Sequence, residues 1–231
     1  MIRLKERLLK IAYMAQEFKR PADIGTDHAY IPIFLVQTGA CSKVIATDIR
    51  KGPLLKAGRN IKKYHLEDRI DLRMGDGIKP IRGGECDSFI IAGMGGVVIA
   101  GIIDSSVEVV KRAESIILQP VYTEEVLRKY LLHKGFRIET ESLVRDDRRI
   151  YVVIKASYDG VSRQAEDLYL HIGKKLFENK DPLLKEYLEK RIRRHTKIVN
   201  GIASSIQKDK EAYMQEKRLL EQMKKAYADY F

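Results

Sequence analysis

Hydrophobic positions in the first two thirds of the chain follow two alternating patterns. Residues 4–15 carry apolar side chains at helical spacing with charges between them, which predicts an amphipathic opening helix. Short apolar runs then alternate with helical segments. The runs predict strands near 21–24, 43–47, 70–74, 88–92 and 115–119, and the segments predict helices near 28–38, 52–64, 97–106 and 123–134. This alternation indicates βαβ units and an α/β fold with a mostly parallel sheet.

The pattern changes after Gly135. Residues 136–144 and 150–156 form two alternating runs rich in β-branched side chains, and the charged segment 145–149 separates them. They predict a hairpin, so the sheet should end with an antiparallel pair. A parallel sheet closed in this way is the Rossmann-like arrangement of class I methyltransferases, whereas NAD-binding Rossmann domains usually continue in parallel.

The last third of the chain has almost no strand signals. We place the boundary at Asp159-Gly160, which gives one domain over 1–158 and a second over 159–231. A helix is expected over 162–179, stopped by Asp181-Pro182. From Leu184 to Ala226 a seam of mostly apolar positions recurs about every 3.5 residues, as in a coiled coil or a helical hairpin. Asn200-Gly201 and Ser204-Ser205 are candidate turns, and one long helix is the alternative.

The charge and the cysteine content indicate which partners the protein binds and in which cellular compartment it acts. The net charge is +11, and both parts of the chain carry more Lys and Arg than Asp and Glu. This favours a polyanionic partner, with RNA or DNA before a membrane surface, although a basic protein with solvated faces is the alternative. Cys41 and Cys86 form no ligand-spaced cluster, so neither a metal site nor a disulfide is expected. Without an apolar signal segment or a membrane-spanning run, we expect a cytoplasmic protein.

Candidate chemistry gathers just past the ends of the predicted parallel strands. The segments there are Asp23-Ile24-Gly25-Thr26-Asp27-His28, Asp48, Gly75-Asp76-Gly77 and Ala92-Gly93-Met94-Gly95-Gly96. Open α/β sheets bind ligands at this edge. The spacing suits a nucleotide-like cofactor lying across several strand ends.

The first segment favours S-adenosylmethionine over NAD, whereas Asp48 supports an adenosine-bearing cofactor of either kind. Gly25 lets a ligand approach the backbone, but the Gly-x-Gly-x-x-Gly fingerprint is absent and Asp27 follows closely. A carboxylate there opposes a pyrophosphate and suits a sulfonium cation. Asp48 can accept the two ribose hydroxyls of an adenosine, and Asp76 can accept its adenine amino group. The alternatives are structural: Asp27 or Asp48 as a cap, and Asp76 as a turn residue.

The glycine-rich segment after the fourth strand is the sharpest local signal. The Asn-Pro-Pro-Tyr tetrapeptide of many amine methyltransferases is absent here. A glycine-lined loop with Met94 offers an open wall and a soft contact for a purine ring. The alternative is a tight turn that buries Met94 in the core.

The segment 23–32, together with Ala92-Gly93-Met94-Gly95-Gly96 and a helical last third, resembles the bacterial tRNA (adenine(22)-N1)-methyltransferase family over essentially the whole chain. The resemblance implies a class I methyltransferase domain, a C-terminal coiled coil, S-adenosyl-L-methionine as cofactor and tRNA as substrate. The expected cofactor-binding residues are Asp23, Gly25, Asp27, His28, Asp48, Asp76, Gly77, Ala92, Gly93 and Met94.

This resemblance predicts an enzyme that methylates N1 of adenine 22. The ring nitrogen has an in-plane lone pair, so positioning should dominate over proton transfer. Asp27, beside the developing positive charge, and Met94, in the pocket wall, are the catalytic candidates. The alternative is that Asp27 only holds the cofactor.

The basic stretch of the last third offers contacts to the RNA backbone. Arg191, Arg193, Arg194 and Lys197 are the expected phosphate-binding residues, and a solvated helix face is the alternative. His195 falls on the apolar seam and is expected to be packed. We expect a monomer or weak dimer without metal or membrane. Two other classes stay open: an NAD-dependent or small-molecule enzyme, and a non-catalytic RNA-binding protein.

Overall fold

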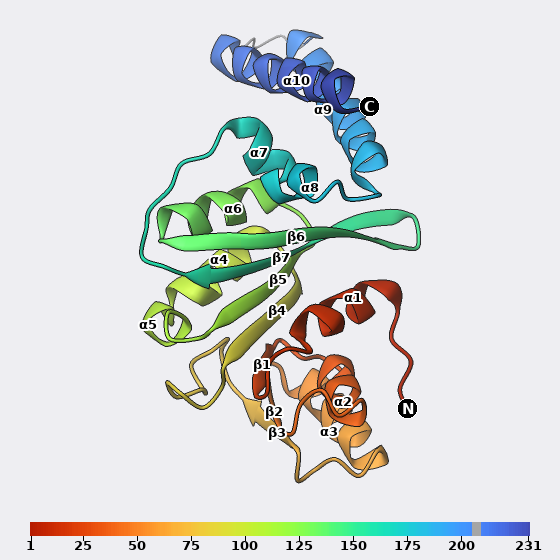
Figure 1. Cartoon of the computed structure of the whole chain (residues 1–231), viewed down its shortest axis with the longest axis vertical. Coiled ribbons are helices and arrows are strands. Elements are labelled where there is room, and N and C mark those ends of the chain that lie inside the picture. The colour runs from red at the N-terminus through yellow and green to blue at the C-terminus, as the bar shows by residue number, and fades with distance from the viewer. Residues whose placement is uncertain (205–208) are drawn as a thin grey trace. The chain divides into compact units, whose positions relative to one another are not determined.

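The protein divides into two compact units. The computed structural model describes residues 1–204 and 209–231. The first unit is Met1–Gln164 and the second is Ala165–Phe231 (Figure 1). The boundary expected at Asp159-Gly160 lies in the segment that follows the last strand and precedes the first helix of the second unit.

Seven strands of the described chain form one sheet in the first unit, in the order β3-β2-β1-β4-β5-β7-β6 (Figure 1). Their bounds are β1 (Pro21–Ile24), β2 (Val44–Asp48), β3 (Ile70–Met74), β4 (Ser88–Met94), β5 (Ser115–Pro120), β6 (Phe136–Asp146) and β7 (Arg149–Tyr158). β1 to β5 are parallel, and β7 runs antiparallel to both β5 and β6. The expected parallel sheet closed by a hairpin is confirmed.

The hairpin is longer than its side chains suggested. Asp146 pairs with Arg149, so the five charged residues expected between the strands shrink to a turn at Asp147 and Arg148. Asp147 takes φ 53°, in the left-handed region that a two-residue hairpin turn requires. Charged residues can extend the ladder because its hydrogen bonds come from the backbone.

Helices of the first unit cover the sheet. They are α1 (Glu6–Ala15), α2 (Tyr30–Gln37), α3 (Lys51–Lys63), α4 (Gly96–Asp104), α5 (Val107–Val110) and α6 (Glu124–His133). Buried residues of α1, α2 and α3 share one hydrophobic core with alternate positions of the central strands, including Ala46, Ile90 and Ile117. β1 and β2 are buried along their whole length, as in sheets covered on both faces. This burial fixes the strand ends that carry the candidate chemistry.

The second unit is helical: α7 (Asp167–Ile172), α8 (Lys174–Glu178), α9 (Leu184–Ser204) and α10 (Lys210–Tyr230). The single helix predicted over 162–179 is wrong. Gly173, at φ 101°, breaks it into α7 and α8, because a helix cannot continue through that conformation.

The long helices α9 and α10 pack against each other in opposite directions. The His195 ring lies 2.7 Å from Glu216, and the Tyr227 hydroxyl donates to Glu189 at 2.8 Å. Because partners later in α9 meet partners earlier in α10, the pair is a helical hairpin rather than one long helix. Asn200-Gly201 lies inside α9, and the other candidate turn includes Ser205, which is outside the described residues. None of the described helices is long and apolar enough to cross a membrane.

Candidate cofactor and active site

A cleft of about 660 Å³ lies at the carboxyl ends of the parallel strands. Its lining brings together all the residues expected to bind the cofactor: Asp23, Gly25, Asp27, His28, Asp48, Asp76, Gly77, Ala92, Gly93 and Met94. Four segments that are far apart in sequence thus share one surface, as a ligand spanning several strands requires.

Gly25, in the segment after β1, lies directly beside Met94 at the end of β4. It has φ +73°, and a Cβ atom at this position would lie 2.2 Å from the methyl carbon of Met94. The amide groups of Gly25 and Thr26 both donate to the Thr47 carbonyl at 2.8 Å, which fixes the loop to β2. The absence of a side chain at Gly25 is therefore what lets Met94 reach across the cleft floor.

Asp48 is buried and held at both carboxylate oxygens. Its Oδ1 accepts from the Arg50 amide at 2.8 Å, and its Oδ2 accepts from the Asp27 amide at 3.3 Å. Each oxygen of a carboxylate has two lone pairs, so both can accept further hydrogen bonds from a ligand. The arrangement fits a pair of adjacent ribose hydroxyls.

Asp27 stands at the cleft with an exposed carboxylate. Its side chain is 55% exposed and lies 3.5 Å from Nε2 of His28, and its backbone takes φ 48°. The residue at the N-cap of α2 is Ala29, so Asp27 does not cap this helix. The His28 ring stacks on Tyr30, with centroids 5.0 Å apart and planes 14° apart.

Asp23 is buried beneath the loop. Burial raises its pKa to about 6, a hydrogen bond from the Thr26 hydroxyl at 2.6 Å lowers it, and the nearby charge of Asp48 raises it further. A buried carboxyl with a pKa in this range is a recurrent feature of functional sites. Asp23 can become fully ionised on contact with a cation.

The segment after β3 is packed around Pro80. A Cβ atom at Gly75 would lie 2.1 Å from the Pro80 ring, and one at Gly77 would lie 3.1 Å from Ile102. Asp76 is exposed and pairs with Lys79 at 2.5 Å. Glycine on either side of Asp76 therefore allows the close packing that presents this carboxylate to the cleft.

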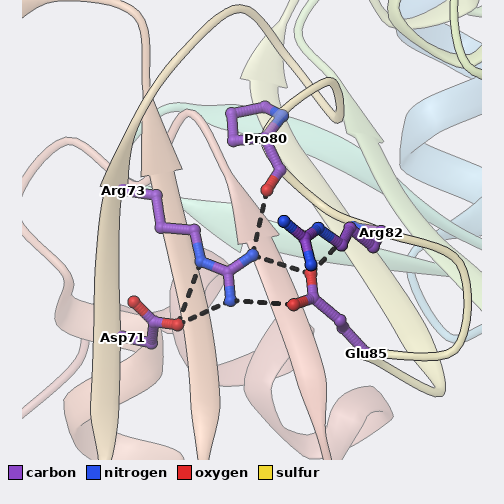
Figure 2. A network of polar contacts seen from close by, with 5 residues as sticks. All are labelled: Asp71, Arg73, Pro80, Arg82 and Glu85. Carbon is purple, nitrogen blue, oxygen red and sulfur yellow. Dashed lines mark hydrogen bonds and ion pairs between the residues drawn. The ribbon is translucent and has the colours of Figure 1, made fainter.

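Figure 2 shows a polar network around Arg73 that includes residues of the connection between β3 and β4. Arg73 of β3 donates to the Pro80 carbonyl at 2.9 Å, to Asp71 at 2.6 Å and to Glu85 at 2.7 Å. Two hydrogen bonds lower the pKa of Glu85 to about 2. The larger contribution comes from the Arg73 side chain and the smaller from the Arg82 amide. The network ties Pro80 and Glu85 of the β3–β4 connection to β3, the strand that ends just before Gly75 and Asp76.

The glycine-rich segment spans the end of β4, which runs to Met94 rather than to the predicted Ala92, and it divides into two parts. Ala92, Gly93 and Met94 line the cleft beside a bulge in the β4–β5 pairing. Gly95 and Gly96 instead pack against the next connection. A Cβ atom there would lie 2.4 Å from the Tyr122 ring and 2.2 Å from the Thr123 carbonyl oxygen, respectively. This second part of the motif is structural.

Arg7 is a cleft residue that sequence reasoning missed. Its Nη1 donates to Oε1 of Gln119 at 2.5 Å, and the same oxygen accepts from the Gly93 amide at 3.2 Å. Arg7 also lies 3.6 Å from Asp146 and over the Tyr151 ring. Nothing in the local pattern of α1 distinguishes Arg7 from its other charged residues, so only the fold places it here.

The residues present fit S-adenosylmethionine. The cleft offers carboxylates at Asp48 and Asp76 that suit ribose hydroxyls and an adenine amino group, and two further carboxylates, Asp23 and Asp27, that suit a cationic group. Gly25 and Gly93 take φ of +73° and +77°, which favours glycine, and Met94 fills the space beside Gly25. Among the described residues, no cluster of three or more His, Cys, Asp or Glu side chains could hold a metal ion.

The expected phosphate-binding residues of α9 do not share one surface. Arg193, Arg194 and Lys197 are exposed, whereas Arg191 is buried and donates to the His171 carbonyl at 3.2 Å. Helical geometry turns Arg191 inward with His195, which is buried and paired with Glu216. The packed role expected for His195 is confirmed, and Arg191 leaves the proposed RNA-binding set.

Comparisons with known proteins decide the family. A family model described as tRNA (adenine(22)-N(1))-methyltransferase matches residues 21–225. The chain belongs to this family. The tRNA (adenine(22)-N(1))-methyltransferase of Bacillus subtilis is 35% identical over 171 residues, which are 71% of this chain and 72% of that protein.

Solved structures of the methyltransferase family extend the likeness to the whole chain. The Mycoplasma capricolum protein TrmK, in complex with S-adenosyl-homocysteine, is 28% identical, covers 99% of both chains and superposes with a TM-score of 0.83. The Bacillus subtilis protein TrmK is 27% identical and superposes with a TM-score of 0.81 over 99% of this chain and 97% of that one. The family, fold and enzyme class expected from the sequence are confirmed. Neither alternative, an NAD-dependent enzyme or a non-catalytic RNA-binding protein, gains support.

Proposed function

We propose that this protein methylates N1 of adenine 22 in tRNA in the cleft at the strand ends, with S-adenosylmethionine as the methyl donor. One observation carries the assignment of the site. The glycine and carboxylate segments after β1, β2, β3 and β4 converge on one cleft in a chain of this family. The Mycoplasma capricolum relative was solved in complex with its natural cofactor product, S-adenosyl-homocysteine, which supports S-adenosylmethionine as the methyl donor.

Different residues of the cleft bind different parts of the cofactor. Asp48 accepts hydrogen bonds from the ribose, and Asp76 accepts from the adenine amino group. Gly25 and Gly93 shape the loops beside the chain of the cofactor, and Asp23 and Asp27 attract its positive charges. His28 and Ala92 complete the lining.

Positioning dominates the chemistry. S-adenosylmethionine, when bound, supplies an electrophilic methyl group carried on a sulfonium. Adenine N1 exposes its lone pair at neutral pH, so no side chain needs to remove a proton before the transfer. Met94, which crosses the cleft to Gly25, forms part of the wall against which the base is aligned. The exposed carboxylate of Asp27 lies at the same loop and stabilises the cationic product base.

Substrate binding requires the Watson–Crick edge of the target adenine to leave any pairing or stacking. The exposed Arg193, Arg194 and Lys197 of α9 suit contacts to the RNA backbone. We further infer that the enzyme acts in the cytoplasm, where tRNA is modified. A monomer or weak dimer remains the prediction for its assembly.

The test is transfer of labelled methyl from S-adenosylmethionine to unmodified tRNA, followed by nucleoside analysis. We expect 1-methyladenosine, and no label on a matched tRNA with guanosine at position 22. An Asp27→Asn variant separates two roles. A loss in kcat with unchanged cofactor affinity assigns Asp27 to catalysis, whereas a matching loss of cofactor affinity assigns it to binding alone. Clear cofactor binding without label on any tRNA would overturn the proposed substrate.

A further inference from the structure

Helix α3 presents a continuous basic face beside the cleft. Lys51, Lys56, Arg59, Lys62 and Lys63 are all exposed. We call these five residues the α3 basic face. At about 100° per residue they fall within an arc of about 140° and extend over about 18 Å along the helix. Buried Ala57 and Ile61 lie on the opposite side of the helix, which packs on β2 and β3.

No acidic residue balances these charges locally. The sequence from 49 to 66 contains no Asp or Glu. Within the part of the chain that the structure describes, Lys56, Arg59, Lys62 and Lys63 make no ion pair, and Lys63 lies over the Tyr64 ring. The cations are therefore available to an anionic partner.

The charge pattern does not serve the helix itself. Arg59 lies three residues from both Lys56 and Lys62 and four from Lys63, and like charges at these spacings destabilise a helix. Lys51 also lies in the first turn, where the helix dipole disfavours a cation. Only Lys62 and Lys63, in the last turn, are favoured by the dipole. A bound polyanion would relieve this repulsion.

Two hydrogen bonds tie α3 to the cofactor loops. The amide of Arg50, the N-cap residue that also lines the cleft, donates to Asp48 at 2.8 Å. Farther along, the Asn60 side chain donates to the His28 carbonyl at 2.9 Å. A ligand held on the α3 basic face is therefore held at a fixed position relative to the methyl-transfer site.

We propose that the α3 basic face binds the tRNA phosphodiester backbone next to the target nucleotide. The proposal rests on the proposed function and adds an RNA-binding surface in the catalytic unit to the one expected on α9. A row of exposed cations suits phosphates, which are bound by charge and hydrogen bonding. A membrane surface is a poorer partner, because the apolar side of α3 is already buried and Leu55 is the one large apolar side chain exposed on the helix.

The test compares two variants of equal net charge in the full-length protein. Variant one combines Lys56→Gln, Arg59→Gln, Lys62→Gln and Lys63→Gln, which leaves Arg50, Lys51 and Asn60 intact. The control combines Lys111→Gln, Lys134→Gln, Lys174→Gln and Lys175→Gln, whose lysines are paired with Glu108, Asp104 and Glu178. Glutamine keeps helix propensity close to that of lysine.

Fluorescence anisotropy with labelled tRNA measures the effect across a salt series. We expect the α3 variant to bind at least about tenfold more weakly and to lose about one unit of salt slope for each phosphate contact removed. The control should bind within about twofold of wild type, and both variants should keep the wild-type affinity for S-adenosylmethionine. In turnover, the α3 variant should show a raised KM for tRNA.

Three outcomes overturn the proposal. One is tRNA affinity of the α3 variant equal to wild type, and another is an equal loss in the control, which would indicate general electrostatics. The third is a selective loss of binding to phosphatidylserine vesicles with unchanged tRNA binding. If wild type binds and methylates tRNA while the α3 variant does so equally well, this inference fails and the proposed function stands. If wild type binds no tRNA, both fail.

Discussion

The cleft and the α3 basic face differ in both the sign and the burial of their charged side chains. In the cleft, Asp23 and Asp48 are buried. Asp23 accepts a hydrogen bond from the Thr26 hydroxyl, and Asp48 accepts one from the Arg50 amide. On α3, the cations are exposed and spread along about 18 Å of helix. Buried groups in a low-dielectric setting act individually and strongly, whereas exposed charges are screened by solvent and act together.

Single substitutions should therefore have large and specific effects in the cleft and small, salt-sensitive effects on α3. The α9 cations provide a third case. Arg193 lies 3.9 Å from Glu189, so part of its charge is already compensated, unlike that of Arg59. Counting basic residues would treat α3 and α9 as equivalent, but the position of the neighbouring carboxylates distinguishes them.

The largest effect is expected from Asp48→Asn. The variant loses the carboxylate that accepts hydrogen bonds from the ribose hydroxyls. Its amide has only one oxygen to offer to the two backbone donors, the Arg50 and Asp27 amides. Hydrogen bonds to charged groups contribute about 1.5–3 kcal/mol, so cofactor affinity should fall by about 10- to 150-fold. Isothermal titration calorimetry with S-adenosylmethionine measures this. An affinity within twofold of wild type, in a variant with unchanged thermal unfolding, would contradict the ribose-binding role.

Gly25→Ala tests the contact with Met94. The new Cβ atom would displace the Met94 methyl group into the cleft, and we expect cofactor affinity to fall about tenfold, or about 1.4 kcal/mol. Gly39→Ala is the matched control, since Gly39 has a similar φ of +75° with no atom within 4 Å of the added carbon. Both variants should lose about 1–2 kcal/mol of unfolding free energy from backbone strain. Equal cofactor affinity in both would show that the Met94 contact is irrelevant to binding.

Asp23 should make cofactor binding depend on pH. Its folded-state pKa is raised from 3.8 to about 6, first by burial. The unfolding free energy from this group is therefore highest below about pH 3.8 and is lost as the pH rises to about 6. Affinity for the cationic cofactor has the opposite sign, because only ionised Asp23 attracts it. It should fall below pH 6 by up to about tenfold per pH unit. Asp23→Asn should remove this dependence, and a variant that keeps it would refute the assignment.

The smallest effect is expected from single substitutions of the basic helices. Arg59→Gln should weaken tRNA binding by about two- to fivefold at low salt, corresponding to about 0.5–1 kcal/mol. Arg193→Gln should have a smaller effect because Glu189 is beside it. Both effects should disappear at high salt. A larger loss for Arg193→Gln than for Arg59→Gln, measured by anisotropy, would reverse the ranking of the two surfaces.

Local pattern was sufficient for most of the first unit. β1 and β3 begin and end where the apolar runs predicted, and the cofactor segments lie at the carboxyl ends of the strands. Short buried strands have a strong apolar signal, and parallel strands align their carboxyl ends at one edge, so adjacency in the sheet brings the motifs together. The family resemblance rested on the same segments.

The errors came from features that local pattern does not encode. Gly173 interrupts the helix predicted over 162–179, and a single glycine in a helical pattern does not announce the conformation it will take. Charged residues next to Asp147 suggested a long loop, although their backbones extend the hairpin. Arg191 shared a basic run with Arg193 and Arg194, but helical rotation turns it inward.

By itself, the sequence determined the order of strands and helices, the strand-end motifs and, through them, the family. Tertiary structure alone decided that Met94 fills the space beside Gly25, that Arg7 reaches Gln119 and Gly93, and that Asn60 of α3 reaches the His28 carbonyl. The physical reason is the distance along the sequence over which each kind of interaction acts. Periodicity and turn chemistry act over a few neighbouring residues, whereas these contacts join residues brought together only when the sheet is assembled and its faces are buried.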